Sequence, residues 1–262
     1  MRGARGSQKV WKLYDELIAA VPEDAVVTEC LAGLSWFLVR SLGTGVAMRP
    51  REIDEPMRNA GKIAGMKARE LAVWIKSWNW YEAAMGLAAI NSALNAQQAV
   101  LKNCGMSLDE MPTQDVFTCM RDELRGKRVA VVGHFHNLER ISNICELTVL
   151  ERKPVAGDMP DPACEYILSE QDVVIMTATT LINKTMPRLL ALSRNARVVV
   201  AGPSTPLHPL MFGYGIEQLG GLVVDDSASV WRAVAEGGRE ALFTQGGRMV
   251  KVSSEPLACG KR

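Results

Sequence analysis

Apolar positions recur with two different periods along this chain, and the change of period separates an N-terminal part from a C-terminal part. In the N-terminal part most apolar positions lie three or four residues apart, which is the period of a helix facing a core. Short apolar runs interrupted by glycine lie between these segments and predict an antiparallel meander. We therefore expect a small α+β unit with helices over 8–20, 63–75 and 79–100 and strands over 25–30, 34–41 and 45–48.

The segment 83–91 consists of small and apolar residues on nearly every face. A helix of this kind is buried on all sides and is approached closely by another backbone. Trp74, Trp78 and Trp80 precede it and could wall a cleft, although aromatic residues at such spacing more often belong to a core.

The C-terminal part alternates short, wholly apolar runs with segments of helical period. The run 129–132 is apolar throughout and stops at Gly133, as expected for a central strand of a parallel sheet that helices cover on both faces. The alternation predicts a doubly wound parallel α/β sheet, for which we expect the strand order 3-2-1-4-5. The further strands are predicted over 147–150, 173–176, 198–201 and 222–224, and the helices over 138–145, 163–168, 186–193 and 229–235.

Two shorter segments complete the outline. Residues 103–126 form a link whose helix ends at Gly126, and two short runs, 242–245 and 248–252, flank a glycine pair as an edge hairpin would. The predicted boundaries are 1–105 for the α+β domain, 106–252 for the α/β domain and 253–262 for a disordered tail.

Composition and charge narrow the classes of protein that this chain could represent. Its 262 residues carry a formal net charge of +1, so no field of one sign favours nucleic acid or an anionic membrane as a partner. Neither a signal-peptide core nor an apolar stretch long enough to span a bilayer is found, which predicts a cytoplasmic protein. The six cysteines are scattered without a CxxC pair, which argues against a structural zinc site and predicts mostly buried thiols.

The ends of the predicted strands gather most of the candidate chemistry. In doubly wound sheets ligands lie beyond the carboxyl ends of the strands, and here hydroxyls, amides, imidazoles and carboxylates follow those ends. We expect a small-molecule ligand to be bound by Gly133, His134, Glu151, Thr177, Thr179, Asn183, Gly202, Ser204 and Thr205.

The turn after the strand 129–132 differs from a dinucleotide site. Glu151 lies where a ribose hydroxyl could be held, but bulky residues occupy 134–136, where backbone amides need small residues to reach a pyrophosphate. Ordinary NAD or FAD binding is therefore disfavoured. An anion is better placed at 177–180 or 202–205, where hydroxyls and amides could form a binding turn. The other interpretation of 202–205 is a rigid loop, and both stay open.

The three histidines of the chain all follow predicted strands, so a transition-metal site has to be weighed. His134 is the candidate metal ligand, with Glu151 or Asp225 as carboxylates that could complete a shell. No third ligand stands at a diagnostic spacing, however. We favour the alternative that His134 contacts an organic ligand or caps the turn, while His136 and His208 are ordinary surface residues.

Three motifs resemble a known family. They are Lys76-Ser77-Trp78-Asn79 with Gly86-Leu87-Ala88-Ala89-Ile90-Asn91, then Val131-Val132-Gly133-His134-Phe135, then Gly202-Pro203-Ser204-Thr205-Pro206-Leu207. Together they resemble the bacterial and archaeal family named "Putative heavy-metal chelation", and the similarity runs from about residue 10 to residue 252.

The resemblance implies an N-terminal domain similar to the enolase N-terminal domain, a Rossmann-like C-terminal domain and an active site between the two. It does not imply enolase activity, because the barrel that carries enolase chemistry has no counterpart here. His136 and His208 are not part of the family pattern.

The leading functional hypothesis combines the predicted pocket with this resemblance. The family name implies a role in handling heavy metals or their chelators, and the pocket would bind a small anionic or metal-chelating ligand between the domains. A cofactor, if one is needed, would be a transition metal or a metal chelate. The alternative is a metal-independent enzyme acting on a nucleotide-like or pterin-like molecule, and a third hypothesis is a pure binding or regulatory module. Whether a reaction is catalysed, and whether the chain forms a homo-oligomer, both stay open.

Overall fold

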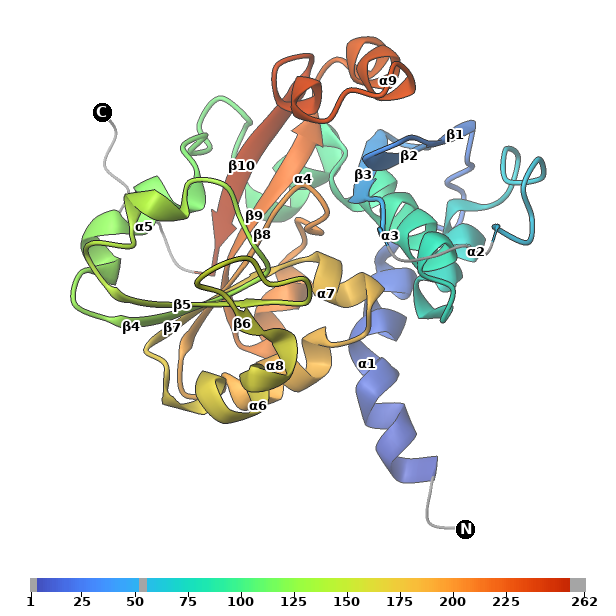
Figure 1. Cartoon of the computed structure of the whole chain (residues 1–262). Helices are drawn as coiled ribbons and strands as arrows, with labels where there is room; N and C mark the ends of the chain where they lie inside the picture. Colours follow the sequence, from blue (N-terminus) through green and yellow to red (C-terminus); the bar gives the residue numbers. More distant parts are fainter. Residues whose placement is uncertain (1–3, 52–55, 255–262) are drawn as a thin grey trace.

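The computed structural model of the chain describes residues 4–51 and 56–254. Its N-terminal part contains a three-stranded antiparallel sheet in the order β1-β2-β3, packed against helices (Figure 1). The predicted meander is therefore confirmed. The elements of this part are α1 (Ala4–Ala20), β1 (Glu29–Ala32), β2 (Trp36–Arg40), β3 (Thr44–Met48), α2 (Ala68–Ala72), the 3-10 helix η1 (Val73–Lys76), α3 (Trp80–Leu94) and α4 (Gln97–Cys104).

Helix α3 is buried along nearly its whole length, as the small residues of 83–91 predict. A Cβ atom on Gly86 would overlap the backbone nitrogen of Ile75 in η1. On the opposite side, a Cβ atom on Gly45 of β3 would overlap the backbone oxygen of Ala88. Glycine is required at both positions because another backbone lies in direct contact.

The C-terminal part contains a seven-stranded sheet in the order β10-β9-β8-β7-β4-β5-β6. All neighbouring strands are parallel except the edge strand β10, which runs antiparallel to β9. The mostly parallel sheet with helices on its faces confirms the predicted fold class. The strands are β4 (Arg128–Val132), β5 (Glu146–Glu151), β6 (Met159–Pro160), β7 (Val173–Thr177), β8 (Arg197–Ala201), β9 (Ile216–Val224) and β10 (Gly247–Ser253). The helices are α5 (Val116–Leu124), η2 (Leu138–Arg140), η3 (Asp161–Ala163), α6 (Cys164–Ile167), η4 (Leu168–Glu170), α7 (Thr179–Ile182), α8 (Met186–Leu192), η5 (Pro209–Tyr214), α9 (Ser227–Ala235) and η6 (Glu240–Phe243).

The position of strand β4 in the sheet explains why its residues are apolar at successive positions. Ala130 and Val132 belong to the main core, which the sheet shares with the N-terminal part. Val129 and Val131 belong to a second core on the other face, where α5 covers the sheet. Both faces of the strand are therefore buried.

The predicted strand order is wrong in one respect. Strand β7 lies beside β4, so that the order of the five predicted strands is 2-1-3-4-5 rather than 3-2-1-4-5. The outer edge of β5 is occupied by the short strand β6, and the chain crosses back to the free side of β4. The point where the connections change direction, and where doubly wound sheets bind ligands, is therefore between β4 and β7.

Other elements differ from their predicted extents. Strand β9 begins at Ile216 rather than at 222. The predicted strand was too short because Gly220-Gly221 interrupts the apolar pattern from which it was predicted. The region 242–245 is not a hairpin strand; it overlaps η6, and β10 pairs with β9 instead. The predicted helix 138–145 is reduced to the 3-10 turn η2.

The predicted helix 79–100 is divided into α3 and α4 at Asn95. The Asn95 side chain leaves the helix to donate hydrogen bonds to the carbonyl oxygens of Thr205 and Leu222, at 2.9 and 3.1 Å, and accepts one from the Leu207 amide at 2.8 Å. Asn91, one turn earlier, donates to the carbonyl of Ser204 at 2.9 Å. These buried amides join α3 to the large sheet, so the two parts are packed through one continuous core. The predicted boundary at residue 105 stays a prediction.

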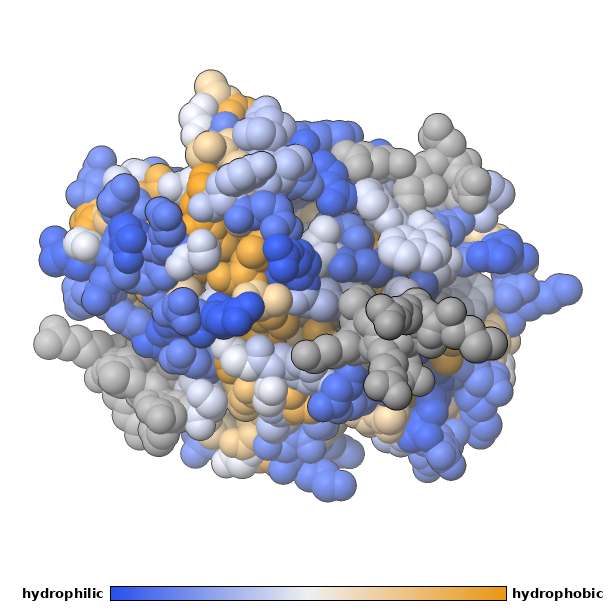
Figure 2. Space-filling model, turned by 90° about the horizontal axis from the view of Figure 1, so that it is seen from below, coloured by the Kyte–Doolittle hydropathy of each residue, from blue (hydrophilic) through white to orange (hydrophobic). Residues whose placement is uncertain are grey.

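Figure 2, which shows the molecule of Figure 1 from below, has apolar residues in a band across its middle and hydrophilic residues on both sides of the band. Within the described residues, none of the helices combines the length and the apolar character needed to cross a bilayer. Residues 255–262, most of the predicted disordered tail, lie outside the described part, and Ser253 ends β10.

Candidate functional site

A pocket of about 720 Å³ lies at the carboxyl ends of the parallel strands, between the large sheet and the end of β3. A cavity of this size accommodates a ligand of cofactor or drug size. The residues predicted from the sequence that line it are Gly133, His134, Glu151, Thr177, Thr179, Asn183, Gly202 and Ser204. Thr205 was predicted as well, but it is fully buried and does not line the pocket.

Two glycines open the floor of this pocket beside Thr177. Gly133 follows β4 with φ +100°, and Gly202 follows β8 with φ +115°, a conformation that favours glycine. A Cβ atom on Gly133 would lie 2.8 Å from Cγ2 of Thr177. The strand ends of β4, β7 and β8 therefore converge on one point, as the sequence predicts for a ligand site.

The threonine turn after β7 is closed by its own hydrogen bonds. Thr177 Oγ1 accepts a hydrogen bond from Thr179 Oγ1 at 3.2 Å, and Thr180 Oγ1 donates to the Thr177 carbonyl at 2.7 Å. Asn183 Oδ1 accepts from both the amide and the hydroxyl of Thr185. These groups shape the wall of the pocket, and anion binding by this turn stays a prediction.

Ser204 and Thr205 form hydrogen bonds that join the two parts of the molecule. Ser204 is 2% exposed, and its hydroxyl accepts a hydrogen bond from the Met48 amide at 2.8 Å. Its carbonyl accepts from Asn91, and the carbonyl of Thr205 accepts from Asn95. The loop 202–205 thus fastens β3 and α3 to the large sheet, and Ser204 also contributes to the pocket surface. These bonds agree with the rigid-loop interpretation, and anion binding by the loop stays a prediction.

His134 is held in place by two carboxylates. Its backbone amide donates to Glu151 Oε2 at 2.8 Å, and its ring Nδ1 lies 2.9 Å from Asp158 Oδ2. Because a carboxylate only accepts, Nδ1 carries the proton and donates it to Asp158. Glu151 also accepts from the Lys153 amide at 3.0 Å, so it organises the loop backbone with both oxygens. Asp158 was missed because it lies in a polar loop well after β5.

The other two histidines differ from each other. His136 lines the pocket, with its side chain 75% exposed and its Nε2 3.9 Å from Glu240. His208 does not line it; its Nδ1 accepts a hydrogen bond from the Leu210 amide and begins η5, and burial lowers its pKa. Asp225 pairs with Arg248 instead. Among residues 4–51 and 56–254, no three His, Cys, Asp or Glu side chains lie close enough together to hold a metal ion.

Basic side chains outnumber acidic ones around the pocket, a feature that the sequence did not indicate. The basic lining residues are Arg49, Arg51, Arg152, Lys153, Arg239 and Lys251, and the acidic ones are Asp115, Glu151, Asp161 and Glu240. Two of the acidic groups pair within the lining, Asp161 with Arg152 at 3.0 Å and Glu240 with Arg239 at 3.6 Å, whereas Asp115 begins α5 and pairs with Arg140 outside it. The lining therefore keeps a modest surplus of basic groups over acidic ones.

Lys251 is the most unusual of these cations. It is only 4% exposed, although it lies on the edge strand β10. Its Nζ lies 2.9 Å from Sγ of Cys119 on α5, and no carboxylate among the described residues pairs with it.

Cys164 is buried, and the other described cysteines, Cys119 included, are only partly buried, so the predicted mostly buried thiols are not found.

Aromatic and apolar side chains form most of the remaining pocket wall. Trp80 begins α3 and lines the pocket, and the Arg152 guanidinium lies 4.8 Å from its ring centroid. Trp78, in contrast, is 73% exposed and lies outside the pocket. Trp36 and several phenylalanines and methionines complete the wall: Phe117, Phe135, Phe243, Met48 and Met249. The wall therefore suits a ligand with an apolar or aromatic body.

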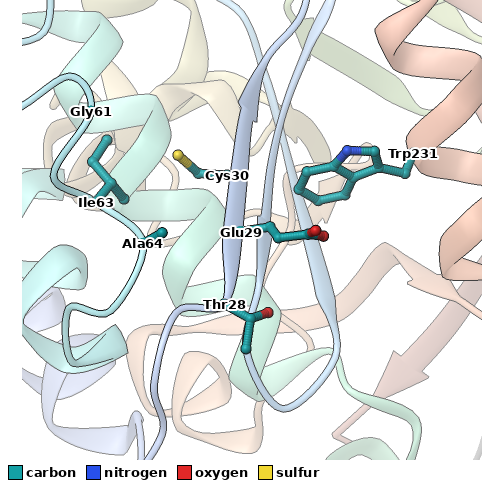
Figure 3. Close-up of a pocket in the computed structure, with 7 residues that line it drawn as sticks. All are labelled: Thr28, Glu29, Cys30, Gly61, Ile63, Ala64 and Trp231. Carbon is teal, nitrogen blue, oxygen red and sulfur yellow. The ribbon is translucent and has the colours of Figure 1, made fainter.

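A second, smaller hollow of about 390 Å³ lies between β1, the loop 61–64 and α9 (Figure 3). Figure 3 shows the Glu29 side chain extending toward Trp231. Arg40 pairs with Glu29 at 2.5 Å and lies over the Trp231 ring at 4.6 Å. The carboxylate of Glu29, the one charged side chain among the described residues that line this hollow, is therefore already paired.

Two perturbed groups lie outside the lining residues. Burial lowers the pKa of Lys184 to about 8, and its ammonium donates to the carbonyls of Ser77 and Ile182. Burial alone would raise the pKa of Glu82, but hydrogen bonds from Arg58 and Ser77 outweigh it and lower the pKa below its usual range. Both groups fix the start of α3 rather than the pocket.

Two family models match the chain, and both carry the description "Putative heavy-metal chelation". One matches residues 14–94, and the other matches residues 115–253, more than half of the chain. The chain belongs to this family. The match agrees with the motifs that resemble the family in the sequence.

Solved structures share the fold over almost the whole chain. A crystal structure of a protein of unknown function from Desulfitobacterium hafniense has a TM-score of 0.84 and 39% identity, covering 94% of this chain and 99% of that chain. One from Pyrococcus horikoshii has a TM-score of 0.75 and 23% identity over 93% and 98% of the two chains, which shows the fold alone. An uncharacterized protein of Methanocaldococcus jannaschii is 30% identical over 159 residues, which span 57% of this chain and 58% of that protein.

Proposed function

We propose that this member of the heavy-metal chelation family binds a small anion in the pocket at the strand ends, either a metal chelate or the chelating compound itself. The buried ammonium group of Lys251 carries this proposal. An ammonium held away from water without a carboxylate partner is unfavourable, and an incoming anion would supply the missing charge. Within the described part of the chain Lys251 contacts the Cys119 sulfur, at 2.9 Å, and no carboxylate, which leaves that need in place.

The surrounding side chains support an anion with an organic body. Arg49 and Arg152 lie against the rings of Tyr81 and Trp80, at 5.2 and 4.8 Å, and so present cations on aromatic platforms. Apolar side chains make up most of the wall. A free inorganic ion would leave this apolar surface unfilled, whereas an organic chelator would cover it.

Calorimetric titration of protein stripped of metal tests the proposal. The probes are nickel, copper and zinc ions alone, nitrilotriacetate and citrate without metal, and the complexes of each metal with each chelator. We expect saturable heat with the anionic chelators or their complexes. The absence of heat with every metal, chelator and complex would remove the proposal.

A second candidate is a metal-independent enzyme acting on a nucleotide-like or pterin-like molecule. The stacking of Arg152 on Trp80 favours it, because a planar ring could extend this stack. Titration of metal-stripped protein with AMP and neopterin, with no chelator in the buffer, separates the two. Binding of AMP or neopterin, together with no measurable heat for any chelator or metal complex, would favour the second candidate.

A further inference from the structure

His134 has one ring nitrogen committed and one available. Nδ1 donates to Asp158, whose side chain is 5% exposed and also accepts the Val155 amide at 3.1 Å. Asp158 is not among the lining residues, whereas His134 is. The carboxylate therefore stands behind the imidazole, and Nε2, with its lone pair, is the nitrogen left for the pocket.

We infer that Nε2 of His134 binds the metal ion of an incoming anionic chelate directly, by filling a coordination position that the chelator leaves open. The inference rests on the function proposed above and names the class of ligand more narrowly: a metal complex with an unsaturated coordination shell. One imidazole supplies one ligand, so the chelator supplies the rest.

The arrangement around His134 is the one that metal-binding imidazoles need. A hydrogen bond from the second ring nitrogen to a carboxylate fixes the tautomer and the ring orientation and makes the ligating nitrogen more basic. The backbone of His134 is held as well, through the 2.8 Å bond from its amide to Glu151. The half-exposed ring, 46% accessible, stays open to a ligand.

The charges of the pocket provide for the rest of such a complex. A chelator that holds a divalent metal with carboxylates remains anionic overall or on its free oxygens. Lys251 lines the same pocket as His134, and its ammonium group can receive those oxygens. Binding would then combine one metal–nitrogen bond with charge-assisted hydrogen bonds.

His136 offers a matched comparison two residues away. It lines the same pocket and is more exposed, and its ring lies 3.9 Å from Glu240, which is itself 67% exposed. It lacks the buried carboxylate that fixes His134. Exposure alone would favour His136 as a metal ligand, whereas the hydrogen-bond geometry favours His134.

Two nickel complexes separate coordination from anion binding. Nitrilotriacetate leaves positions open on nickel, and EDTA saturates it, while both complexes are anionic. Calorimetry on the untagged full chain should show the nitrilotriacetate complex binding at least about tenfold more tightly than the EDTA complex. His134→Gln should abolish this difference and His136→Gln should preserve it. Asp158→Asn should weaken the nitrilotriacetate complex by about ten- to a hundredfold.

Copper–nitrilotriacetate adds a spectroscopic readout that a purely structural role would not change. Electron spin echo modulation from the remote nitrogen of a coordinated imidazole should appear with the wild type and with His136→Gln, and disappear with His134→Gln. Equal affinity for the two nickel complexes, or a modulation that survives His134→Gln, would overturn the inference. Equal and saturable binding of both complexes would leave the proposed anion site standing, so the two failures are distinguishable.

Discussion

Replacement of Lys251 by methionine should separate binding from stability. The substitution removes the ammonium group and keeps a long apolar side chain of similar volume at a site that is 4% exposed. A hydrogen bond to a charged group contributes about 1.5–3 kcal/mol, so the affinity for nitrilotriacetate should fall by about ten- to a hundredfold. The stability should not fall with it, because the Cys119 sulfur is the one partner that the described residues offer the lost ammonium. Replacing a buried charge of this kind by a packed apolar group is often neutral or stabilising.

Calorimetry and thermal unfolding followed by circular dichroism measure the two effects on the same preparations. Lys127→Met is the matched control, since Lys127 is exposed, lies outside the lining residues and changes the net charge equally. We expect it to leave both quantities unchanged. A Lys251→Met protein that keeps its affinity but loses more than about 1 kcal/mol of stability would refute the reasoning, because Lys251 would then be a structural residue.

Three further predictions concern the packing of α3 and the buried charges beside it. Gly86→Ala should lower the free energy of unfolding in urea by about 3 kcal/mol or more, because the added methyl group meets the backbone of Ile75. Gly213→Ala is the control and should change it little, because nothing lies within 4 Å of that position. Similar losses in the two variants would contradict the packing. Because burial lowers the pKa of Lys184 to about 8 while the unfolded chain keeps a value of about 10.4, the unfolded state binds more protons between these values, and stability should rise with pH over that window. Lys184→Met should flatten the rise, and an unchanged rise would place the titration elsewhere. Hydrogen bonds hold the pKa of Glu82 below its usual range despite burial, so the stabilisation that Glu82 provides should be complete above the usual pKa and disappear as the pH falls through the lowered one. Glu82→Gln should therefore lower stability at pH 7 and reduce the loss of stability below about pH 4. An acid unfolding profile identical to that of the wild type would contradict this.

The parts of the structure that the sequence predicts are those that local hydrophobic patterns determine. The parallel strands, the meander and the buried helix of 83–91 follow from runs and periods of a few residues. The grouping of candidate ligand-binding residues after the strands follows from the same patterns, because the carboxyl ends of parallel strands lie at one edge of the sheet. The position of β7 beside β4 does not, since the parallel strands are similar apolar runs whose order depends on tertiary packing.

The residues that sequence reasoning missed come from distant segments. Arg49, at the end of β3, and Lys251, on the edge strand, line the pocket, and Asp158, in the loop after β5, holds the ring of His134 without lining it. Lys251 alternates with apolar residues along β10, a pattern in which a lysine usually faces water. Its ammonium group instead contacts Cys119 on α5, a tertiary contact that no local pattern encodes.

Mass spectrometry of the small molecules that the protein carries through gentle purification tests most directly whether the pocket beside Lys251 holds an anion. Wild-type protein and Lys251→Met would be purified in parallel, denatured, and the released compounds compared. We expect an anionic compound able to chelate metal in the wild type and its depletion from the variant. A neutral or cationic compound retained equally by both proteins would contradict it.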